Sequence, residues 1–372
     1  MSAAQWRRAM NSSAQTAQPA TVRGIGSGSA AAGIATLAPS AREPWRNPIA
    51  ARHVIVLLAL LAYPFLATPF FTFQIAGQAL ALGTIALSLT FLAGSGGMVS
   101  LAQMTIAGLA GYMVAILGTS ASPISMGWPW WIAVLLAIVI ATVFATFVGW
   151  LAVRTEGIYT IMITLAIGVA FFYLVLQNYS MFNGFQGFHK VIPPVVFGID
   201  FGQAIPYYFL ALFWALASYF FIKYLLRAPF GVALQGVRDN ARRMNALGFN
   251  GTAHRVAAYA VAGVIAAVGG VLLLWYNKLV TPGVVGTGAL INILVIAVLG
   301  GMRHPIGPFI GALVFVLLQT FAIDSFVRER FNLVIGTVFL IIVLFSSDGL
   351  LGWWARLRSS TGGAQARLKE PK

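Results

Sequence analysis

The sequence contains no cysteine, which excludes disulfide bonds, thiolate metal sites and cysteine nucleophiles. Charged residues are also scarce: they make up 8% of the chain, against roughly 25% in soluble globular proteins. A chain that is 59% hydrophobic, with a mean hydropathy of +0.87, cannot be a soluble globule and predicts a membrane protein. The few acidic residues all lie at the ends of apolar runs or between them: Glu43, Glu156, Asp200, Asp239, Asp324, Glu329, Asp348 and Glu370.

No Asp, Glu, Lys or Arg is predicted near the middle of a membrane span. Transporters driven by ions or protons usually carry an ionisable group at that depth, so its absence argues against energy coupling within this chain. The glycine-rich stretch Gly24 to Gly28 is not followed by Gly-Lys-Ser/Thr and is not a phosphate-binding loop. Energy for uphill transport would therefore have to come from another subunit.

Other enzymatic or metal chemistry has little support. The four histidines, His53, His189, His254 and His304, lack the short spacings of a metal site. No set of nucleophile, base and orienting group is visible, which disfavours a membrane enzyme. No cofactor is implied.

Ten apolar runs approach the length of about 20 residues that crosses the hydrocarbon core. They predict an all-α, polytopic membrane helix bundle with about ten transmembrane helices. The first two runs adjoin each other between Phe73 and Gln74. The runs are 54–73, 74–93, 98–117, 129–153, 157–177, 206–226, 256–276, 288–302, 305–323 and 331–347.

The distribution of Lys and Arg predicts the orientation of these spans. With the N-terminus in the cytoplasm, 19 of the 23 basic residues fall on the cytoplasmic side, and only Lys190, Lys278, Arg328 and Arg330 fall outside. Both termini are therefore predicted to be cytoplasmic. We interpret the net charge of +15 as topology and contact with anionic lipids, with no nucleic-acid binding.

The two ends of the chain differ from the apolar middle, 51–353. Residues 1–50 are rich in Ala, Ser, Gln and Gly, and contain five arginines and one acid. This composition is typical of a disordered basic cytoplasmic tail, with an organelle transit peptide as the alternative. No apolar core of a secretory signal precedes the first span. Residues 354–372 form a second basic tail.

Uncharged polar residues are candidates for lining a pathway through the spans. Thr84 and Ser88 are four residues apart, as are Thr160 and Thr164, so each pair shares one helix face. The alternative is that the hydroxyls bond their own i−4 carbonyls and that amides join neighbouring helices. The candidate pathway residues are Thr84, Ser88, Gln103, Tyr159, Thr160 and Thr164.

The longest basic loop, 227–255, separates two apolar runs. Pro229 cannot continue the preceding helix, which should end near Arg227. We expect one short helix over 233–247, outside the bilayer, followed by a left-handed turn at Gly248.

This loop resembles the ATPase-docking loop of branched-chain amino acid ABC importer permeases, whose pattern runs S-P-F-G-R-A-L-x-A-I-R-E-N-E-x-x-A-E-A-L-G. The residues in register with it are Pro229, Phe230, Gly231, Ala233, Leu234, Arg238, Asn240, Ala246, Leu247 and Gly248, and Asp239 retains the acid. Ala241 and Asn245 replace acids of the pattern.

Three further segments resemble the same family: 96–112, 157–166 and 298–312. With the loop, they extend the resemblance over about 260 residues, from the second span to the last. Two departures bear on the solute. Gln103 stands where the family has a histidine, and Phe182 to Gly187 replace its T-G-G-x-x-G loop.

The resemblance implies an inner-membrane permease subunit of an ATP-driven importer in bacteria. Its expected partners are a homologous permease, two cytoplasmic ABC ATPases and an extracytoplasmic solute-binding protein. It also implies that the chain lines half of an alternating-access pathway and has no catalytic residues. The predicted ATPase-docking residues are Arg238, Asp239, Asn240, Ala246, Leu247 and Gly248.

The sequence alone leaves two alternatives open. The solute expected from the resemblance is a branched-chain or other small apolar amino acid, and urea, a short amide or an organic acid is the alternative. A secondary transporter or channel that needs no ATPase is the alternative of another class.

Overall fold

The computed structural model describes residues 51–120, 122–155, 157–196, 198–302 and 304–325. The chain divides into two units, Met1–Leu57 and Leu58–Lys372. Helix α3 (Ala51–Leu66) begins in the first unit and ends in the second. All other described elements belong to the second unit. The predicted span at 331–347 and both predicted tails lie outside the described residues.

The described part of the second unit is almost entirely helical. Its longer elements are η1 (Phe71–Gly77), α4 (Gln78–Gly96), α5 (Gln103–Leu117), α6 (Trp130–Ala152), α7 (Ile158–Gln177), α9 (Ala204–Arg227), α10 (Pro229–Asp239), α12 (Gly251–Asn277), α13 (Thr287–Gly300) and α14 (Gly307–Ser325). The short elements are α8 (Tyr179–Phe182), η2 (Gly184–Gln186), α11 (Ala241–Ala246), η3 (Pro282–Val285) and the two-residue strands β1 (Phe188–His189), β2 (Val195–Val196), β3 (Ile199–Asp200) and β4 (Leu279–Val280).

Five described helices are long and apolar enough to cross a membrane: Phe71–Gly96, Trp130–Ala152, Ile158–Gln177, Ala204–Arg227 and Gly251–Asn277. Three shorter apolar helices, Gln103–Leu117, Thr287–Gly300 and Gly307–Phe321, correspond to the third, eighth and ninth predicted runs, although the first of them begins five residues after the predicted start at 98. These helices confirm the all-α polytopic class. They can lie in lipid because a helix satisfies its own backbone hydrogen bonds.

The boundary predicted between the first two runs, at Phe73 and Gln74, is wrong. The first helix, α3, ends at Leu66, and the next helix begins before Gln74, since Phe71–Gly96 is continuous and opens with a π-helical stretch, η1. Pro69 lies just before that stretch. A proline favours the first turn of a helix, where its missing N–H costs nothing, so the break falls before Pro69 rather than at Phe73.

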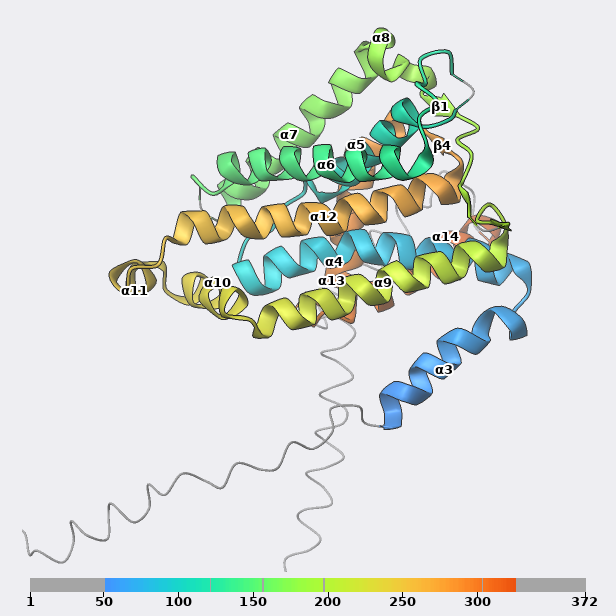
Figure 1. Ribbon diagram of the computed structural model, residues 1–372. Coiled ribbons are helices and arrows are strands. Elements are labelled where there is room, and N and C mark those ends of the chain that lie inside the picture. Colours follow the sequence, from blue (N-terminus) through green and yellow to red (C-terminus); the bar gives the residue numbers. More distant parts are fainter. Residues whose placement is uncertain (1–50, 121, 156, 197, 303, 326–372) are drawn as a thin grey trace, which may run out of the picture. The chain divides into compact units, whose positions relative to one another are not determined.

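Helix α12 lies between α6 and α4 and also packs against α5 (Figure 1). All residues of α5 are buried. Of the most apolar window in each long helix, 83% is buried in Phe71–Gly96, but only 28% in α7 and in α9. Helices α4, α5 and α12 therefore form the interior, while α6, α7 and α9 expose apolar faces of the kind that suit lipid.

Close packing in this interior depends on small side chains. Ala133, Ala137, Ala141 and Ala145 form a fully buried stripe on α6. A Cβ on Gly263 of α12 would lie 2.3 Å from Cβ of Ala145. Such contacts let helix backbones approach each other, which is the main source of helix association in lipid.

The loops gather at two ends of the bundle. At one end, β1 pairs with β4, with Phe188 opposite Val280, and the Ile192 N–H donates to the Thr119 carbonyl at 3.4 Å. At the other end, Arg238 of α10 donates to the Gly94 carbonyl at the end of α4. We call these the β1 end and the α10 end. Lys190 and Lys278 thus lie at the β1 end and loop 227–255 at the α10 end. Which end faces the cytoplasm stays a prediction.

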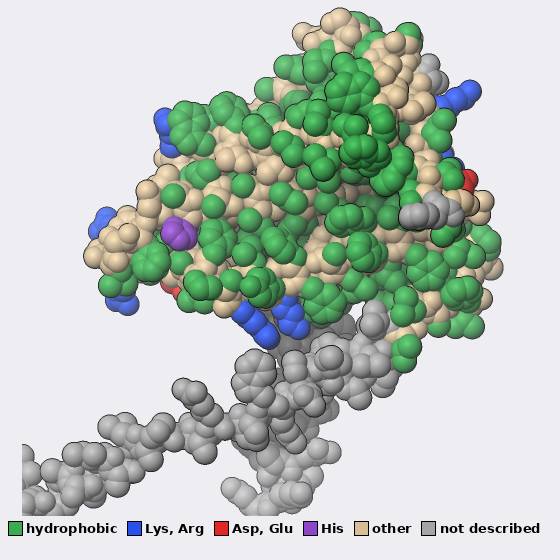
Figure 2. Space-filling model, viewed as in Figure 1, with side chains coloured by type: hydrophobic (Ala, Val, Ile, Leu, Met, Phe, Trp, Pro, Cys, Tyr) green, Lys and Arg blue, Asp and Glu red, His purple; other side chains and the backbone are tan. Residues whose placement is uncertain are grey.

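The charged surface has the same division. On the face shown in Figure 2, hydrophobic side chains spread over the middle of the helices, whereas the Lys and Arg side chains lie at the helix ends. Apolar side chains between charged ends are typical of a protein that spans a bilayer.

Thiol labelling tests which end faces the cytoplasm. Phe185 at the β1 end is 74% exposed, and Arg242 on α11 is exposed at the α10 end. Because the chain has no native cysteine, a Phe185→Cys variant should react with an impermeant maleimide in sealed cells. An Arg242→Cys variant should react only after permeabilisation. Labelling of Arg242→Cys in sealed cells would overturn the orientation.

Candidate functional site

The segment between α9 and α12 contains two helices, not the single helix predicted over 233–247. Helix α9 ends at Arg227 as predicted, and α10 begins at Pro229, four residues before the predicted start. The chain leaves helical geometry at Asn240 (φ −156°, ψ 91°), whose side chain accepts from the Arg243 N–H at 2.9 Å. Asparagine is a strong helix N-cap, and this cap starts α11.

The turn after α11 has the geometry that the sequence predicts. Gly248 has a φ of +88°, in the left-handed region that favours glycine. Leu247, just before it, is 67% exposed.

Two aromatic contacts hold this turn against the bundle. The ring of His254, in the first turn of α12, stacks on Phe230 of α10 and meets Phe249 edge-on, with both centroids at 5.9 Å. Gly231 permits the close crossing of α10 and α9, since a Cβ there would lie 2.2 Å from the Leu225 carbonyl oxygen. The α10–α11 unit is therefore fixed to the bundle, while Leu247 is presented to solvent.

The remaining predicted docking residues have separate environments. Ala246 and Gly248 are exposed beside Leu247. Asn240 serves as the α11 cap. Arg238 and Asp239 form an ion pair of 2.8 Å with side chains 38% and 66% exposed. Arg238 also reaches the end of α4, away from Leu247.

A cavity of about 290 Å³ lies at the α10 end, and we call it the α10-side cavity. Its lining is mainly polar and comes from four parts of the chain: Gly97, Met98, Thr155, Gly157, Thr160, Val237, Arg238, Ala241 and Arg255. The volume is near the lower end of the range for small-molecule sites. Of the predicted pathway residues, Thr160 lines it.

A series of polar contacts continues from this cavity into the bundle. Thr164, one turn beyond Thr160 on α7, is fully buried, and its hydroxyl donates to the Thr160 carbonyl at 3.0 Å. The same hydroxyl accepts from the Leu101 N–H at 3.1 Å. Leu101 belongs to residues 97–102, which join α4 to α5 without regular structure and which we call the α4–α5 turn.

Gln103 begins α5 at the end of that turn and is fully buried. Its Oε1 lies 3.0 Å from the Ser88 hydroxyl oxygen of α4, which is also 2.6 Å from the Ile85 carbonyl. Within the described residues, the Gln103 Nε2 has no hydrogen-bond partner. Either orientation of the amide leaves one of its polar ends unpaired, and burial of an unpaired amide is costly unless a ligand or water uses it.

The structure thus brings Ser88, Gln103, Thr160 and Thr164 together around the α4–α5 turn. Thr84 lies one turn before Ser88 on α4, and Tyr159 directly precedes Thr160 on α7. Thr84 is buried, and its hydroxyl donates to its own i−4 carbonyl, that of Leu80, at 2.8 Å. Tyr159 is 65% exposed on the first turn of α7, on the surface of the chain.

Sequence reasoning missed Ser100, Thr105 and Tyr259. All are buried, and the hydroxyls of Ser100 in the α4–α5 turn and of Tyr259 on α12 have no hydrogen-bond partner among the described residues. Thr105 Oγ1 has no partner among the described residues and faces Gly168 of α7, lying 3.0 Å from where a Cβ would be. Ser100 and Thr105 flank Gln103 in the sequence, and that proximity was the available signal.

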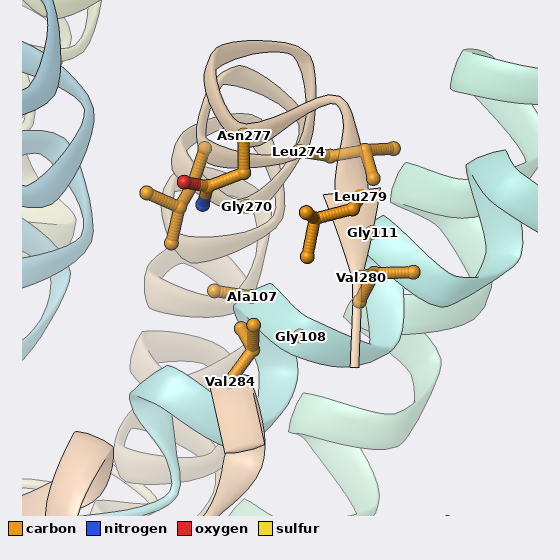
Figure 3. Close-up of a pocket in the computed structure, with 10 residues that line it drawn as sticks. Ala107, Gly108, Gly111, Gly270, Leu274, Asn277, Leu279, Val280 and Val284 are labelled. Atoms are coloured by element: carbon orange, nitrogen blue, oxygen red, sulfur yellow. The ribbon is translucent and has the colours of Figure 1, made fainter. Parts of the chain in front are cut away.

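A small hollow lies beside the middle of α5. It measures about 10 Å³, and Figure 3 shows the residues that line it, among them Ala107, Gly270, Asn277 and Val284. That volume holds about one water molecule, so this hollow is too small for a solute. Among the described residues, no three His, Asp or Glu side chains are placed to hold a metal ion.

Near the α10 end, the pKa of His304 departs from its ordinary value. Burial lowers the pKa of the His304 imidazole, and the positive charge of Lys223 lowers it further. His304 is therefore neutral at pH 7 and adds no charge to that end.

The apolar helices, with the helix pair α10 and α11 beside them, define a polytopic helical membrane protein. The chain belongs to the family described as branched-chain amino acid transport system / permease component, whose model matches residues 71–344.

The chain is also similar to two curated proteins. One is the high-affinity branched-chain amino acid transport system permease protein LivM of Salmonella typhimurium, with 23% identity over 327 residues, 81% of this chain and 75% of the relative. The other is the protein of the same name from Escherichia coli, with 23% identity over 321 residues, 80% of this chain and 74% of the relative. No solved structure matches.

Proposed function

We propose that this chain is the permease subunit of an ATP-driven importer for a branched-chain or other small amphipathic amino acid in the bacterial cytoplasmic membrane. Its partners would be a homologous permease, two cytoplasmic ABC ATPases and an extracytoplasmic solute-binding protein. The observation that carries the proposal is the α10–α11 unit. It presents an exposed Leu247 outside the bundle while α10 lines the cavity where the buried polar route begins.

This arrangement supports an external source of energy. The pathway residues Ser88, Gln103, Thr160 and Thr164 carry no charge, so none of them could couple movement to a proton by titration. A cytoplasmic ATPase that binds Leu247 could act on the α10–α11 unit. In this proposal the α10 end faces the cytoplasm, both termini lie inside, and loop 227–255 is the docking loop of a permease domain at 51–353.

The polar route suits a solute with one polar and one apolar end. The α10-side cavity is lined in part by Arg238 and Arg255, but beyond it a zwitterion would have to be solvated by amides, hydroxyls, helix ends and water. Gln103 and the N-terminus of α5 provide such donors beside the Thr164 hydroxyl, and the surrounding α4, α5 and α12 are apolar. Urea, a short amide or an organic acid is the alternative solute.

Uptake into vesicles tests the proposal. The complete complex, with its solute-binding protein, should accumulate labelled leucine when ATP is supplied, and urea and an aromatic acid serve as comparison solutes. An ATPase subunit with its catalytic base removed is the control and should abolish accumulation. Accumulation that persists with that control would indicate a secondary transporter or channel. Uptake of urea or the acid in place of leucine would overturn the amino-acid assignment.

A further inference from the structure

Arg238 connects the α10–α11 unit to the interior of the bundle. Its Nη1 donates to the Gly94 carbonyl, in the last turn of α4, and its Nε and Nη2 contact Asp239 Oδ1, each at 2.8 Å. Its aliphatic stem lies flat on Gly97, because a Cβ built on Gly97 would be 2.7 Å from the Arg238 Cγ. The ion pair with its neighbour orients the guanidinium toward α4.

Helix α4 itself provides no hydrogen-bond donor for the Gly94 carbonyl that Arg238 reaches. Helix α4 ends at Gly96, and the N–H groups of Gly97 and Met98 both donate to the Leu92 carbonyl. Carbonyls nearer the end lack intrahelical partners and carry the negative end of the helix dipole, which a cation stabilises. Arg238 therefore caps α4 from a separate part of the chain.

The contact is supported by packing on the same face of α10. Leu234 and Val237 are 0% and 1% exposed, whereas Val232, on the other side of the helix, is 60% exposed. Leu234 Cδ1 lies 3.9 Å from where a Cβ would be on Gly96. The α4–α5 turn beyond Gly96 holds the Leu101 N–H on Thr164 and leads to Gln103 beside Ser88.

We infer that Arg238 is a positioning residue that transmits movement of the α10–α11 unit to the α4–α5 turn. The sequence predicts Arg238 as an ATPase-docking residue, but in this inference it does not dock the ATPase itself, because its guanidinium contacts Asp239 and the Gly94 carbonyl. It keeps α10 attached to the end of α4, so that displacement of the unit moves Leu101 and Gln103 relative to Thr164 and Ser88. The inference rests on the proposed ATPase docking at Leu247.

The first test replaces Arg238 with methionine, which keeps the stem and removes the cation, and with lysine, which keeps a cation. In the complete complex, Arg238→Met should bind the ATPase and hydrolyse ATP as the wild type does. Its leucine uptake per ATP should fall about tenfold, since a lost hydrogen bond to a charged group weakens a contact by that factor or more. Arg238→Lys should recover part of the leucine uptake per ATP.

Loss of ATPase binding in Arg238→Met would mean that Arg238 docks the ATPase directly, and an unchanged uptake ratio would mean that it transmits nothing. Either result overturns the inference. A wild-type complex without ATP-dependent uptake would instead overturn the proposed function, so the two failures are distinguishable.

A covalent link provides a second test. The Cβ of Arg238 lies 3.7 Å from the ideal Cβ position on Gly97, within the range of a disulfide. In a Gly97→Cys/Arg238→Cys complex, leucine uptake per ATP should be low while the two cysteines are reduced. It should rise on oxidation, because the disulfide attaches α10 to the end of α4 again. The single variants are the controls and should not respond to oxidation. Disulfide formation without recovery of the ratio would contradict the inference.

Discussion

Replacing Leu247 with aspartate is expected to abolish solute uptake while the permease still inserts and folds. Leu247 is 67% exposed, so the bundle loses little when it is changed. In a groove of the ATPase, burial of a leucine would contribute about 1.5 to 3 kcal/mol, and an aspartate would add an unpaired buried charge. Capture of the ATPase by the tagged permease and ATP-dependent leucine uptake are the measurements, and both should be lost.

A matched exposed site distinguishes docking from general damage. Phe185 is 74% exposed at the β1 end, so Phe185→Asp introduces the same charge where no ATPase is expected. It should leave capture of the ATPase unchanged. Capture and uptake at wild-type levels in Leu247→Asp would mean that the α10–α11 unit is not the docking site.

Replacing Gly270 with alanine is expected to destabilise the folded permease severely. A Cβ on Gly270 of α12 would lie 2.0 Å from the carbonyl oxygen of Ala107 on α5. The obstacle is backbone, so no side chain can rotate away and the two interior helices must separate. Overpacking costs about 1 to 3 kcal/mol where side chains can adjust, so we expect about 3 kcal/mol or more here. A thermal melt of the detergent-purified permease would measure it.

Gly288 provides the control for this substitution. It also lies in a helix, α13, but no heavy atom is within 4 Å of the Cβ that alanine would add. Gly288→Ala should leave the melting temperature unchanged or raise it slightly, because alanine favours helix by about 1 kcal/mol. A Gly270→Ala protein that melts with the wild type would show that α5 and α12 do not pack this closely.

The sequence predicted the positions of most helices because hydropathy is a local property. Helix α6 was expected at 129–153 and spans Trp130–Ala152, and α9 was expected at 206–226 and spans Ala204–Arg227. In lipid, each segment must satisfy its backbone groups within itself. The length of an apolar run is then almost the length of the helix.

The misplaced boundary at Phe73 and the single helix predicted over 233–247 have local causes that are visible in the sequence. Pro229 favours the first turn of a helix, which places the start of α10 before Ala233, and Asn240 favours an N-cap, which divides the segment in two. Pro69 similarly marks the start of the second long helix. In each case the hydrophobic pattern was uniform across the break and gave no boundary.

The sequence by itself determined that the chain is a polytopic helical membrane protein, which ends of its helices share a side, and that loop 227–255 resembles a docking loop. Only the tertiary structure decided which polar residues meet. Helices α4 and α5 are buried on all sides, so no periodicity marks the face on which Gln103 finds Ser88. The contact of Arg238 with Gly94 joins residues far apart in the chain. Such a contact depends on how α9, α10 and α4 pack, which local sequence does not specify.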